Sequence, residues 1–385
     1  MNSGEVQARH IETGQSIRVC WKDGVISSVE PASASPKDLW VAPPLLDLQV
    51  NGFGGIDFQQ DDISLPELVQ AIHGLRAAGC PLFLLTLITD EWPRMLDRLR
   101  CFRELRAKSP ELQDAIVGWH IEGPFLSSQP GFSGAHNPKA MRDPKPADME
   151  ELRRVCGDDP VLLTLAPERL DAIASIERAI PLGIRVSLGH TDASAKRIDQ
   201  AVKAGATAFT HLGNGCPRDL NRHDNILWRV FETSRIFVSL IPDAIHVDPS
   251  LFRLAHRLLG KDRIYYVTDA MSAAGAPPGQ YRLGQLTLEV GEDEVVRLPG
   301  SANFAGSALS PLDGILRAAE MLHCTWRDVW PQYSTNPARL MGFNYGLNVG
   351  APATFCVAEA VSEPVNVVSQ LDVYIRGERH CAIDL

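Results

Sequence analysis

The chain has 385 residues, of which 45% are hydrophobic and 22% are charged, a composition typical of a globular protein with a substantial buried core. Its formal net charge of −10 argues against nucleic acid or an anionic membrane as the main partner, although one or two local cations could still hold a small phosphorylated ligand. The sequence has no secretory signal pattern and no apolar run long enough to span a bilayer. The eight cysteines form no Cys-x-x-Cys pair, which indicates reduced thiols, and we expect a cytoplasmic protein.

Both ends of the chain have the pattern of short strands joined by turns. The predicted strands are Ser16–Val19, Val25–Val29, Thr354–Ala358 and Val367–Ile375, and the predicted turns are Asp23–Gly24 and Arg376–Gly377. We expect these ends to pair as a small discontinuous β-domain made of residues 1–42 and 343–385. The barrel-type domain described next would then span residues 43–342.

The middle of the chain alternates between continuous apolar runs and helical patterns. The apolar runs are Leu45–Val50, Pro81–Thr89, Ala115–Ile121, Val161–Ala166, Arg185–Leu188, Thr207–Leu212, Phe237–Ile241 and Arg263–Thr268. The helical segments between them include Pro66–Ala78, Trp92–Ala107, Asp171–Ile180, Ala193–Ala204 and Pro249–Leu259. Continuous apolar runs are typical of parallel strands that are buried on both faces. Eight such units in series favour an α/β fold of the (β/α)₈ TIM-barrel type over an open doubly wound sheet.

Polar and ionisable residues, together with one glycine, lie within these runs or shortly after them, near the strand ends where barrel enzymes carry their active sites. They are Asp47, Gln49, Asn51, His120, Glu122, Gly123, His190, His211, Asn214, Asp243, His246 and Asp269. Taken alone, each has a structural explanation, because a single histidine is more often hydrogen-bonded than metal-bound and Asp269 could cap a helix. Two imidazoles and a carboxylate from neighbouring strands nevertheless make a three-ligand metal site with an open position for water. Zinc is the first expectation for such a set, and iron, cobalt or manganese would also fit.

Several short motifs give the sequence a family resemblance. They are Leu46-Asp47-Leu48-Gln49-Val50-Asn51-Gly52, His120-Ile121-Glu122-Gly123-Pro124-Phe125, Gly134-Ala135-His136-Asn137-Pro138, Leu188-Gly189-His190-Thr191, Thr210-His211-Leu212, Asp243-Ala244-Ile245-His246-Val247-Asp248, Val267-Thr268-Asp269-Ala270, Ala305-Gly306-Ser307 and Asn336-Pro337-Ala338-Arg339. With these motifs in order along the whole chain, the sequence resembles the amidohydrolase superfamily and, within it, the deacetylases of N-acetylglucosamine 6-phosphate.

The resemblance implies a metal-dependent hydrolysis of an N-acetyl group, giving glucosamine 6-phosphate and acetate in amino-sugar catabolism. It implies Glu122, His190 and His211 as metal ligands and Asp269 as the acid/base, and His136 is our candidate for stabilising the oxyanion. The implied substrate-contact positions are Ala135, His136, Asn214, Gly215, Arg222, Asp243, Ala244, Ile245, His246, Phe304, Ala305 and Gly306. Gln49 and Asn51 replace the superfamily's usual His-x-His pair, and because neutral amides are poor ligands we expect one metal per chain.

The substrate phosphate is the least constrained part of this prediction. Arg222 and His246 are our hypothesis for its binding, with His223 as a further donor, although a cation on a solvated loop would contribute little. The segment around Gly213, Asn214 and Gly215 departs from the bulkier residues of the family pattern. The sequence therefore constrains the identity of the sugar less than it constrains the type of reaction. The resemblance also implies a homodimer, because in the family this arginine can come from a neighbouring subunit.

Three alternatives remain open from the sequence. The first is a deacetylase of another N-acetyl hexosamine phosphate. The second is a cyclic amidase, which is disfavoured because the third and fourth predicted strands contain no lysine that could bridge two metals. The third is a non-catalytic protein that binds a sugar phosphate, which would have no need of the proton-transfer group at Asp269.

Overall fold

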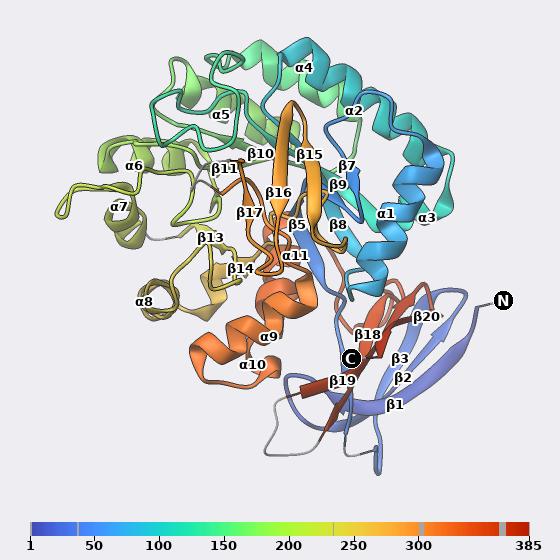
Figure 1. Ribbon diagram of the computed structural model, residues 1–385. Helices are drawn as coiled ribbons and strands as arrows, with labels where there is room; N and C mark the ends of the chain where they lie inside the picture. The colour runs from blue at the N-terminus through green and yellow to red at the C-terminus, as the bar shows by residue number, and fades with distance from the viewer. Residues whose placement is uncertain (1, 37, 234, 300–303, 362–366, 385) are drawn as a thin grey trace.

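The computed structural model describes residues 2–384, except residues 37, 234, 300–303 and 362–366, and Figure 1 shows a barrel beside a separate sheet. The barrel strands are β5 (Leu46–Val50), β8 (Leu82–Ile88), β9 (Ile116–Glu122), β10 (Val161–Leu165), β11 (Ile184–Leu188), β12 (Ala208–Phe209), β13 (Phe237–Leu240) and β14 (Ile264–Tyr266). They pair in parallel in the order of the chain, and a parallel bridge from Val50 to Ala270 joins the first strand to the segment after the last. Each predicted apolar run overlaps one of these strands, so the (β/α)₈ prediction is confirmed.

Burial explains why these strands read as continuous apolar runs. Every residue of β5, β9 and β10 is buried, because the barrel interior covers one face and helices cover the other. The helices are α1 (Leu65–Ala77), α2 (Trp92–Ala107), α3 (Pro110–Ala115), α4 (Pro146–Cys156), α5 (Ala172–Ala179), α6 (Ala195–Ala204), α7 (Ile226–Glu232), α8 (Pro249–Leu259), α9 (Pro311–Leu322), α10 (Trp326–Tyr333) and α11 (Thr335–Met341), with short 3₁₀ turns at Ile180–Leu182 and Lys261–Arg263. Capping residues explain where some of these helices begin. Ser64 and Glu67 form a capping box at the N-terminus of α1, and Ser194 caps the N-terminus of α6.

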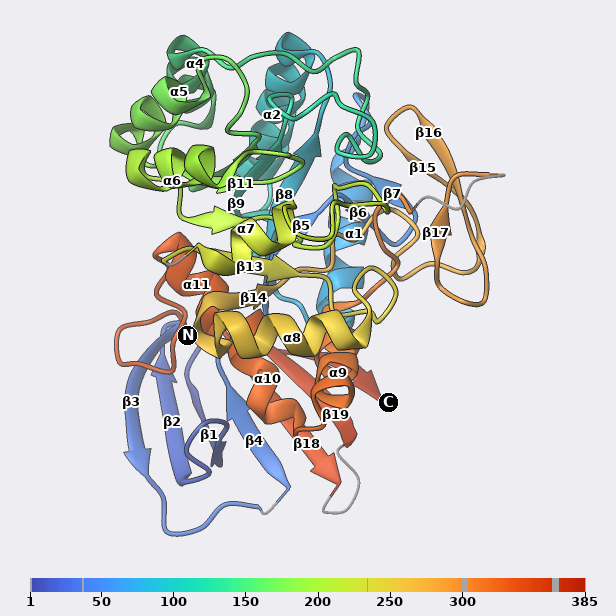
Figure 2. The ribbon, with the colours of Figure 1, turned by 90° about the vertical axis from the view of Figure 1, so that its left-hand side faces the viewer.

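The two ends of the chain form a seven-stranded sheet that lies beneath the barrel in Figure 2. Its strands are β1 (Gly4–His10), β2 (Ser16–Lys22), β3 (Val25–Pro31), β4 (Leu39–Ala42), β18 (Phe355–Val361), β19 (Val367–Ile375) and β20 (Glu378–Asp384). Antiparallel pairing of β4 with β18 joins the N-terminal and C-terminal halves, as the sequence predicted. The predicted turns are present, with Asp23 and Gly24 both at positive φ between β2 and β3. Three strands of this sheet, β1, β4 and β20, were not predicted.

A small antiparallel sheet follows the last barrel strand, and no sequence pattern predicted it. It consists of β15 (Gly279–Leu283), β16 (Leu286–Val290) and β17 (Val296–Arg297), and it projects from the barrel on the same side as the short hairpin of β6 (Gly52–Phe53) and β7 (Ile56–Asp57) (Figure 2). Among the helices that are described, none is both long enough and apolar enough to cross a membrane.

Candidate active site at the ends of the barrel strands

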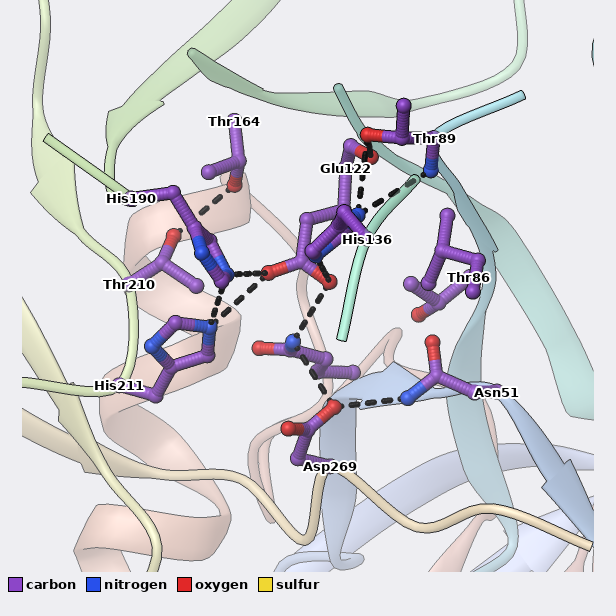
Figure 3. Close-up of polar contacts among 12 residues, drawn as sticks. Asn51, Thr86, Thr89, Glu122, His136, Thr164, His190, Thr210, His211 and Asp269 are labelled. Atoms are coloured by element: carbon purple, nitrogen blue, oxygen red, sulfur yellow. Dashed lines mark hydrogen bonds and ion pairs between the residues drawn. The ribbon is translucent and has the colours of Figure 1, made fainter. Parts of the chain in front are cut away.

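Four predicted site residues converge where the barrel strands end, and Figure 3 shows their side chains facing one another. Glu122 is the last residue of β9, and His190, His211 and Asp269 lie just after β11, β12 and β14. These last three have positive φ angles of 49°, 33° and 53°. Non-glycine residues rarely adopt this backbone conformation, and it is concentrated at functional sites, where the surrounding structure stabilises it. The strand ends are therefore shaped to turn these side chains toward a common centre.

Glu122 and the two histidines form a compact buried cluster. Oε1 of Glu122 lies 2.9 Å from Nε2 of His211 and 3.4 Å from Nε2 of His190, and the two Nε2 atoms are 3.1 Å apart. All three residues are at most 5% exposed. Burial opposes the ionisation of Glu122, but its contacts with the imidazoles of His190 and His211 outweigh it, so the pKa of this carboxyl lies well below its usual range. The cluster thus presents a carboxylate to two imidazoles in a site shielded from water.

The donor atoms of this cluster suit a metal cation. Nδ1 of His190 donates to the carbonyl oxygen of Phe132 at 2.8 Å, and in a neutral ring this leaves the lone pair on Nε2 directed into the cluster. An Nε2 lone pair, a second imidazole nitrogen and a carboxylate oxygen are typical ligands of zinc and similar ions. Among the described residues, Glu122, His136 and His190 also offer ligand atoms that all lie within 4.8 Å of one another. The residues present therefore fit a bound metal.

His136 enters the site from the loop after β9. The backbone N–H of Thr89 donates to Nδ1 of His136 at 3.3 Å, so in the neutral ring the proton belongs on Nε2. This Nε2 lies 3.7 Å from Oε2 of Glu122, at the edge of the cavity. Burial, reinforced by the neighbouring His190, lowers the pKa of His136 to about 3. A neutral ring with Nε2–H toward the cavity is a hydrogen-bond donor rather than a metal ligand.

Asp269 is held by two side-chain amides on the opposite side of Glu122. Nε2 of Gln49 donates to Oδ1 of Asp269 at 3.0 Å and to Oε2 of Glu122 at 3.1 Å, and Nδ2 of Asn51 donates to Oδ1 of Asp269 at 2.7 Å. Burial, followed by repulsion from Glu122, raises the pKa of Asp269 to about 6. A carboxyl with such a pKa can both take up and release a proton near neutral pH.

A line of buried side chains lies beneath the metal cluster and connects four neighbouring strands. Nδ1 of His120 donates to the carbonyl oxygen of Leu48 at 2.9 Å, and its Nε2 lies 2.8 Å from Oγ1 of Thr164. Thr164 Oγ1 is 2.9 Å from Oγ1 of Thr210, which is 2.6 Å from Oγ of Ser187. Burial lowers the pKa of His120 to about 4, so this imidazole is neutral. His120 was grouped with the strand-end residues in the sequence, but it lies below them and braces the strands.

Asp47 is a second buried support. Its Oδ2 accepts hydrogen bonds from the backbone N–H and the hydroxyl of Thr268, at 3.0 and 2.6 Å, and its Oδ1 accepts from the backbone N–H of Gln49 at 3.0 Å. These bonds connect the strand that carries Gln49 to the residue directly before Asp269. Because the side chain is fully buried, desolvation raises the pKa of Asp47 to about 7.

A cavity of about 100 Å³ opens above the cluster and brings together most of the predicted substrate-contact residues. Those that line it are Ala135, His136, Asn214, Gly215, His246, Phe304, Ala305 and Gly306. The cavity also includes Leu283 of β15, which the sequence analysis missed because nothing in the sequence ties that strand to the barrel mouth.

The remaining predicted contacts do not line the cavity. The carboxylate of Asp243 binds the Nδ1 of His246 at 2.5 Å and accepts from the backbone N–H of Ile245 and of His246, so it orients His246. Ala244 has a φ of 60° in the turn between them. The backbone carbonyl of Arg222 accepts a hydrogen bond from Nε1 of Trp228, and Arg222 borders neither this cavity nor the larger one that adjoins it.

Comparison with known proteins agrees with this geometry. No family model matches the chain. The N-acetylglucosamine-6-phosphate deacetylase of Danio rerio is 30% identical over 357 residues, covering 88% of this chain and 84% of that protein. The N-acetylgalactosamine-6-phosphate deacetylase of Escherichia coli O157:H7 is 29% identical over 362 residues, covering 92% of each chain. A solved aspartate-to-alanine variant of the N-acetyl-D-glucosamine-6-phosphate deacetylase of Mycobacterium smegmatis, in complex with N-acetyl-D-glucosamine-6-phosphate, is 29% identical, with a TM-score of 0.85 and coverage of 98% of this chain and 99% of that one.

The barrel, with its buried histidines and carboxylates at the carboxyl ends of the strands, defines the protein as an amidohydrolase. On the similarity along most of its length, the chain belongs to the N-acetylglucosamine-6-phosphate deacetylase family.

Proposed function

We propose that the protein hydrolyses the N-acetyl group of N-acetylglucosamine 6-phosphate, giving glucosamine 6-phosphate and acetate in amino-sugar catabolism. The observation that carries the proposal is the juxtaposition of Asp269, with its pKa of about 6, and the metal-binding cluster on one small cavity. A protein that only bound a sugar phosphate would not need a proton-transfer group at this position. The absence of lysine from β9 and β10 also disfavours the cyclic-amidase alternative.

In this proposal Glu122, His190 and His211 hold one divalent metal, with zinc our first choice over iron, cobalt or manganese. When bound, the metal supplies Lewis-acid chemistry, activating water and polarising the amide carbonyl. Nδ1 of His190, which donates to Phe132, orients one ligand ring for this role. The amide of Gln49 donates to both Glu122 and Asp269, and the amide of Asn51 donates to Asp269, so N–H donors rather than metal ligands lie between the carboxylates, which supports a single metal.

The proton transfers fall to Asp269. Its carboxylate accepts a proton from the attacking water and then delivers it to the departing nitrogen, because an amine leaves an amide only when it is protonated. The hydrogen bonds from Gln49 and Asn51 hold the carboxylate in place during both steps. His136, neutral and with Nε2–H toward the cavity, donates to the carbonyl oxygen as negative charge develops on it.

The test is acetate release from a panel of sugars by the metal-replete protein. We expect the highest kcat/KM with N-acetylglucosamine 6-phosphate and a much lower value with unphosphorylated N-acetylglucosamine. Hydantoin-type cyclic amides contain no acetyl group, so their ring opening is measured separately, and we expect none. The 29% identity to an N-acetylgalactosamine-6-phosphate deacetylase makes that epimer the second candidate. A higher kcat/KM for the galactose epimer would replace our substrate assignment, and failure to release acetate from any member would overturn the deacetylase proposal.

The proposal extends to the organisation of the protein. We place the domain boundaries at residues 42/43 and 342/343, so that the terminal sheet and the barrel are separate units of one chain. We further propose a cytoplasmic homodimer, in which the cysteines of the described residues are free thiols and the dimer is the one that the sequence resemblance implies. Sedimentation analysis of the purified protein would test the dimer, with a monomer as the contradicting result.

A further inference from the structure

Two buried polar residues behind the wall of the catalytic cavity have no part in the chemistry proposed above. Asp57 is the last residue of β7, Gln59 lies two positions later, and they are 6% and 3% exposed. Neither lines the cavity, yet their hydrogen bonds hold the backbone at or beside Asn51, Ile88 and Leu283, which do line it. Burying a polar side chain is costly unless it is hydrogen-bonded, so these bonds show what the two residues support.

Gln59 takes the place of a neighbouring strand at the end of β8. Its Nε2 donates to the carbonyl oxygen of Thr86 at 2.9 Å, and its Oε1 accepts from the backbone N–H of Ile88 at 3.0 Å. A residue of a parallel neighbouring strand would bind the same two groups, on either side of Leu87. Because the pairing of β8 with β5 ends at Leu85, the amide of Gln59 extends this ladder and fixes the position of Ile88.

Asp57 holds the turn of the small antiparallel sheet. Its Oδ2 accepts from the backbone N–H of Gly284 at 2.8 Å, and its Oδ1 accepts from the backbone N–H of Gln59 at 2.9 Å. Gly284 follows Leu283 in the turn between β15 and β16. Leu283 is the one buried residue of β15, at 3% exposure, and the one residue of that strand that lines the cavity. Asp57 therefore connects the sheet to the barrel directly beside this side chain.

Leu283 belongs to the apolar part of the cavity wall. The apolar lining residues are Ile88, Ala135, Leu283, Phe304 and Ala305. All of them except Phe304, which is 41% exposed, belong to or pack against one hydrophobic cluster. A substrate whose amide lies at the metal cluster turns its acyl methyl group toward this apolar surface, because the remaining lining side chains are mostly polar. With a volume of about 100 Å³, the cavity has room for an acetamido group and little more.

We propose that Leu283 limits the N-acyl group of the substrate to acetyl, and that Asp57 and Gln59 are positioning residues that hold this wall of the cavity in place. The inference rests on the proposed deacetylase function and assigns the limit on acyl length to a sheet outside the barrel. One methylene more or less in a hydrophobic pocket changes kcat/KM by about 10- to 200-fold. The wild type should therefore prefer N-acetylglucosamine 6-phosphate to N-propanoylglucosamine 6-phosphate by about 10-fold or more.

The first test compares kcat/KM for these two substrates by the release of glucosamine 6-phosphate, their common product. Leu283→Ala should raise the ratio of propanoyl to acetyl activity by about 10-fold or more, because it makes room for the extra methylene. Leu286→Ala is the matched control, since Leu286 lies on the adjoining strand and packs against the same cluster without lining the cavity. Its ratio should equal that of the wild type. An unchanged ratio in Leu283→Ala would overturn the proposal.

The second test asks whether Asp57 acts through Leu283. Asp57→Ala leaves the N–H of Gly284 without its acceptor and should raise the same ratio, and its effect should not add to that of Leu283→Ala in a double-mutant cycle. Asp57→Asn keeps one acceptor oxygen and should recover part of the wild-type ratio, whereas the exposed Asp62→Ala should not change it. A general loss of stability would lower both activities together. An unchanged ratio in Asp57→Ala, or full additivity, would therefore overturn the positioning role.

Hydrogen exchange of backbone amides measures the two supports without turnover. Exchange should accelerate at Gly284 in Asp57→Ala and at Ile88 in Gln59→Leu, each by on the order of 10-fold, because one hydrogen bond is lost. Asp62→Ala should exchange as the wild type does at both amides. Unaltered exchange in the two test variants would overturn the positioning roles. Accelerated exchange in a protein that deacylates no N-acyl sugar phosphate would instead overturn the proposed function and leave the positioning roles standing.

Discussion

Asn51 and Asp269 lie 218 positions apart in the sequence, yet Nδ2 of Asn51 donates a hydrogen bond of 2.7 Å to Oδ1 of Asp269. Gln49, two residues before Asn51, donates to the same oxygen and to Oε2 of Glu122. Amide hydrogens therefore separate two buried carboxylates that would otherwise repel each other. The two amides therefore place partial positive charge beside these carboxylates, which is part of what a cation bound there would supply.

The first prediction concerns these two amides. The double variant Gln49→His/Asn51→His should raise the metal content from about one to about two ions per chain, because imidazole lone pairs would replace amide N–H donors beside two carboxylates. Elemental analysis after dialysis measures it. The matched control is Gln49→Leu/Asn51→Leu, which removes the amides without adding ligands and should not gain a metal. An unchanged metal content in the double-histidine variant would contradict the prediction.

The second prediction concerns the metal ligands. His211→Ala should reduce the bound metal to a small fraction of the wild-type amount, since it removes one of three proposed ligands from the cluster. His73→Ala, an exposed histidine on α1, is the control and should retain the metal. If His211→Ala keeps its metal and His136→Ala loses it, then His136 is the ligand, in line with its proximity to Glu122 and His190.

The third prediction concerns proton transfer. Asp269→Asn should fold and bind metal, yet lose roughly two orders of magnitude or more in kcat, because the amide has the shape of the carboxylate but no basic oxygen. Single-turnover acetate release from the metal-replete variant measures the loss. Near-normal turnover would mean that another group moves the proton.

The fourth prediction concerns the hydrogen-bonded side chains of His120, Thr164, Thr210 and Ser187 beneath the metal cluster. Thr164→Val keeps the shape of the side chain but leaves His120 and Thr210 without their shared partner, which costs on the order of 1–3 kcal/mol of unfolding free energy. We also expect metal affinity to fall by about 10-fold, a typical effect of losing support behind metal ligands. Thr164→Ser restores the hydroxyl and should recover most of both quantities. Equal behaviour of the valine and serine variants would show that the hydroxyl has no such role.

The fifth prediction concerns pH and Asp47. Its pKa is about 7 in the folded protein against 3.8 for an ordinary aspartate, so the folded state binds this proton more tightly than the unfolded chain does. The stabilisation is complete below about pH 4 and is lost as the pH rises through 7, by an amount on the order of a few kcal/mol. Urea unfolding of Asp47→Asn should therefore show a smaller decline in stability over this range than the wild type. The exposed Asp62→Asn should keep the wild-type slope, and an unchanged slope in Asp47→Asn would refute the assignment.

The barrel and the approximate location of the site could be predicted from the sequence because both depend on local patterns. Parallel strands buried on both faces require continuous apolar runs, and each run in this chain became a strand. Polar residues near the ends of such runs must meet at one end of the barrel, which is why Glu122, His190 and His211 could be placed there with the other strand-end residues before any coordinates. The family resemblance then singled out these three as metal ligands. The separate sheet followed from strand patterns at both ends of the chain.

Only the tertiary structure determines the direction in which each of these side chains points. Arg218 and Arg222 lie four residues apart in one loop, and of the two only Arg218 borders the larger cavity that adjoins the catalytic one. Their spacing does not show this, because an irregular loop has no periodicity from which to infer the side that a residue faces. The sequence also did not show that His120, two residues before Glu122 on β9, lies beneath the metal cluster and forms hydrogen bonds to neighbouring strands. The pairing of Asn51 with Asp269 also depends on closure of the barrel, since it is a contact between the first strand and the segment after the last. Local sequence determined which chemical groups stand at the strand ends, and the closed barrel determined which of them touch.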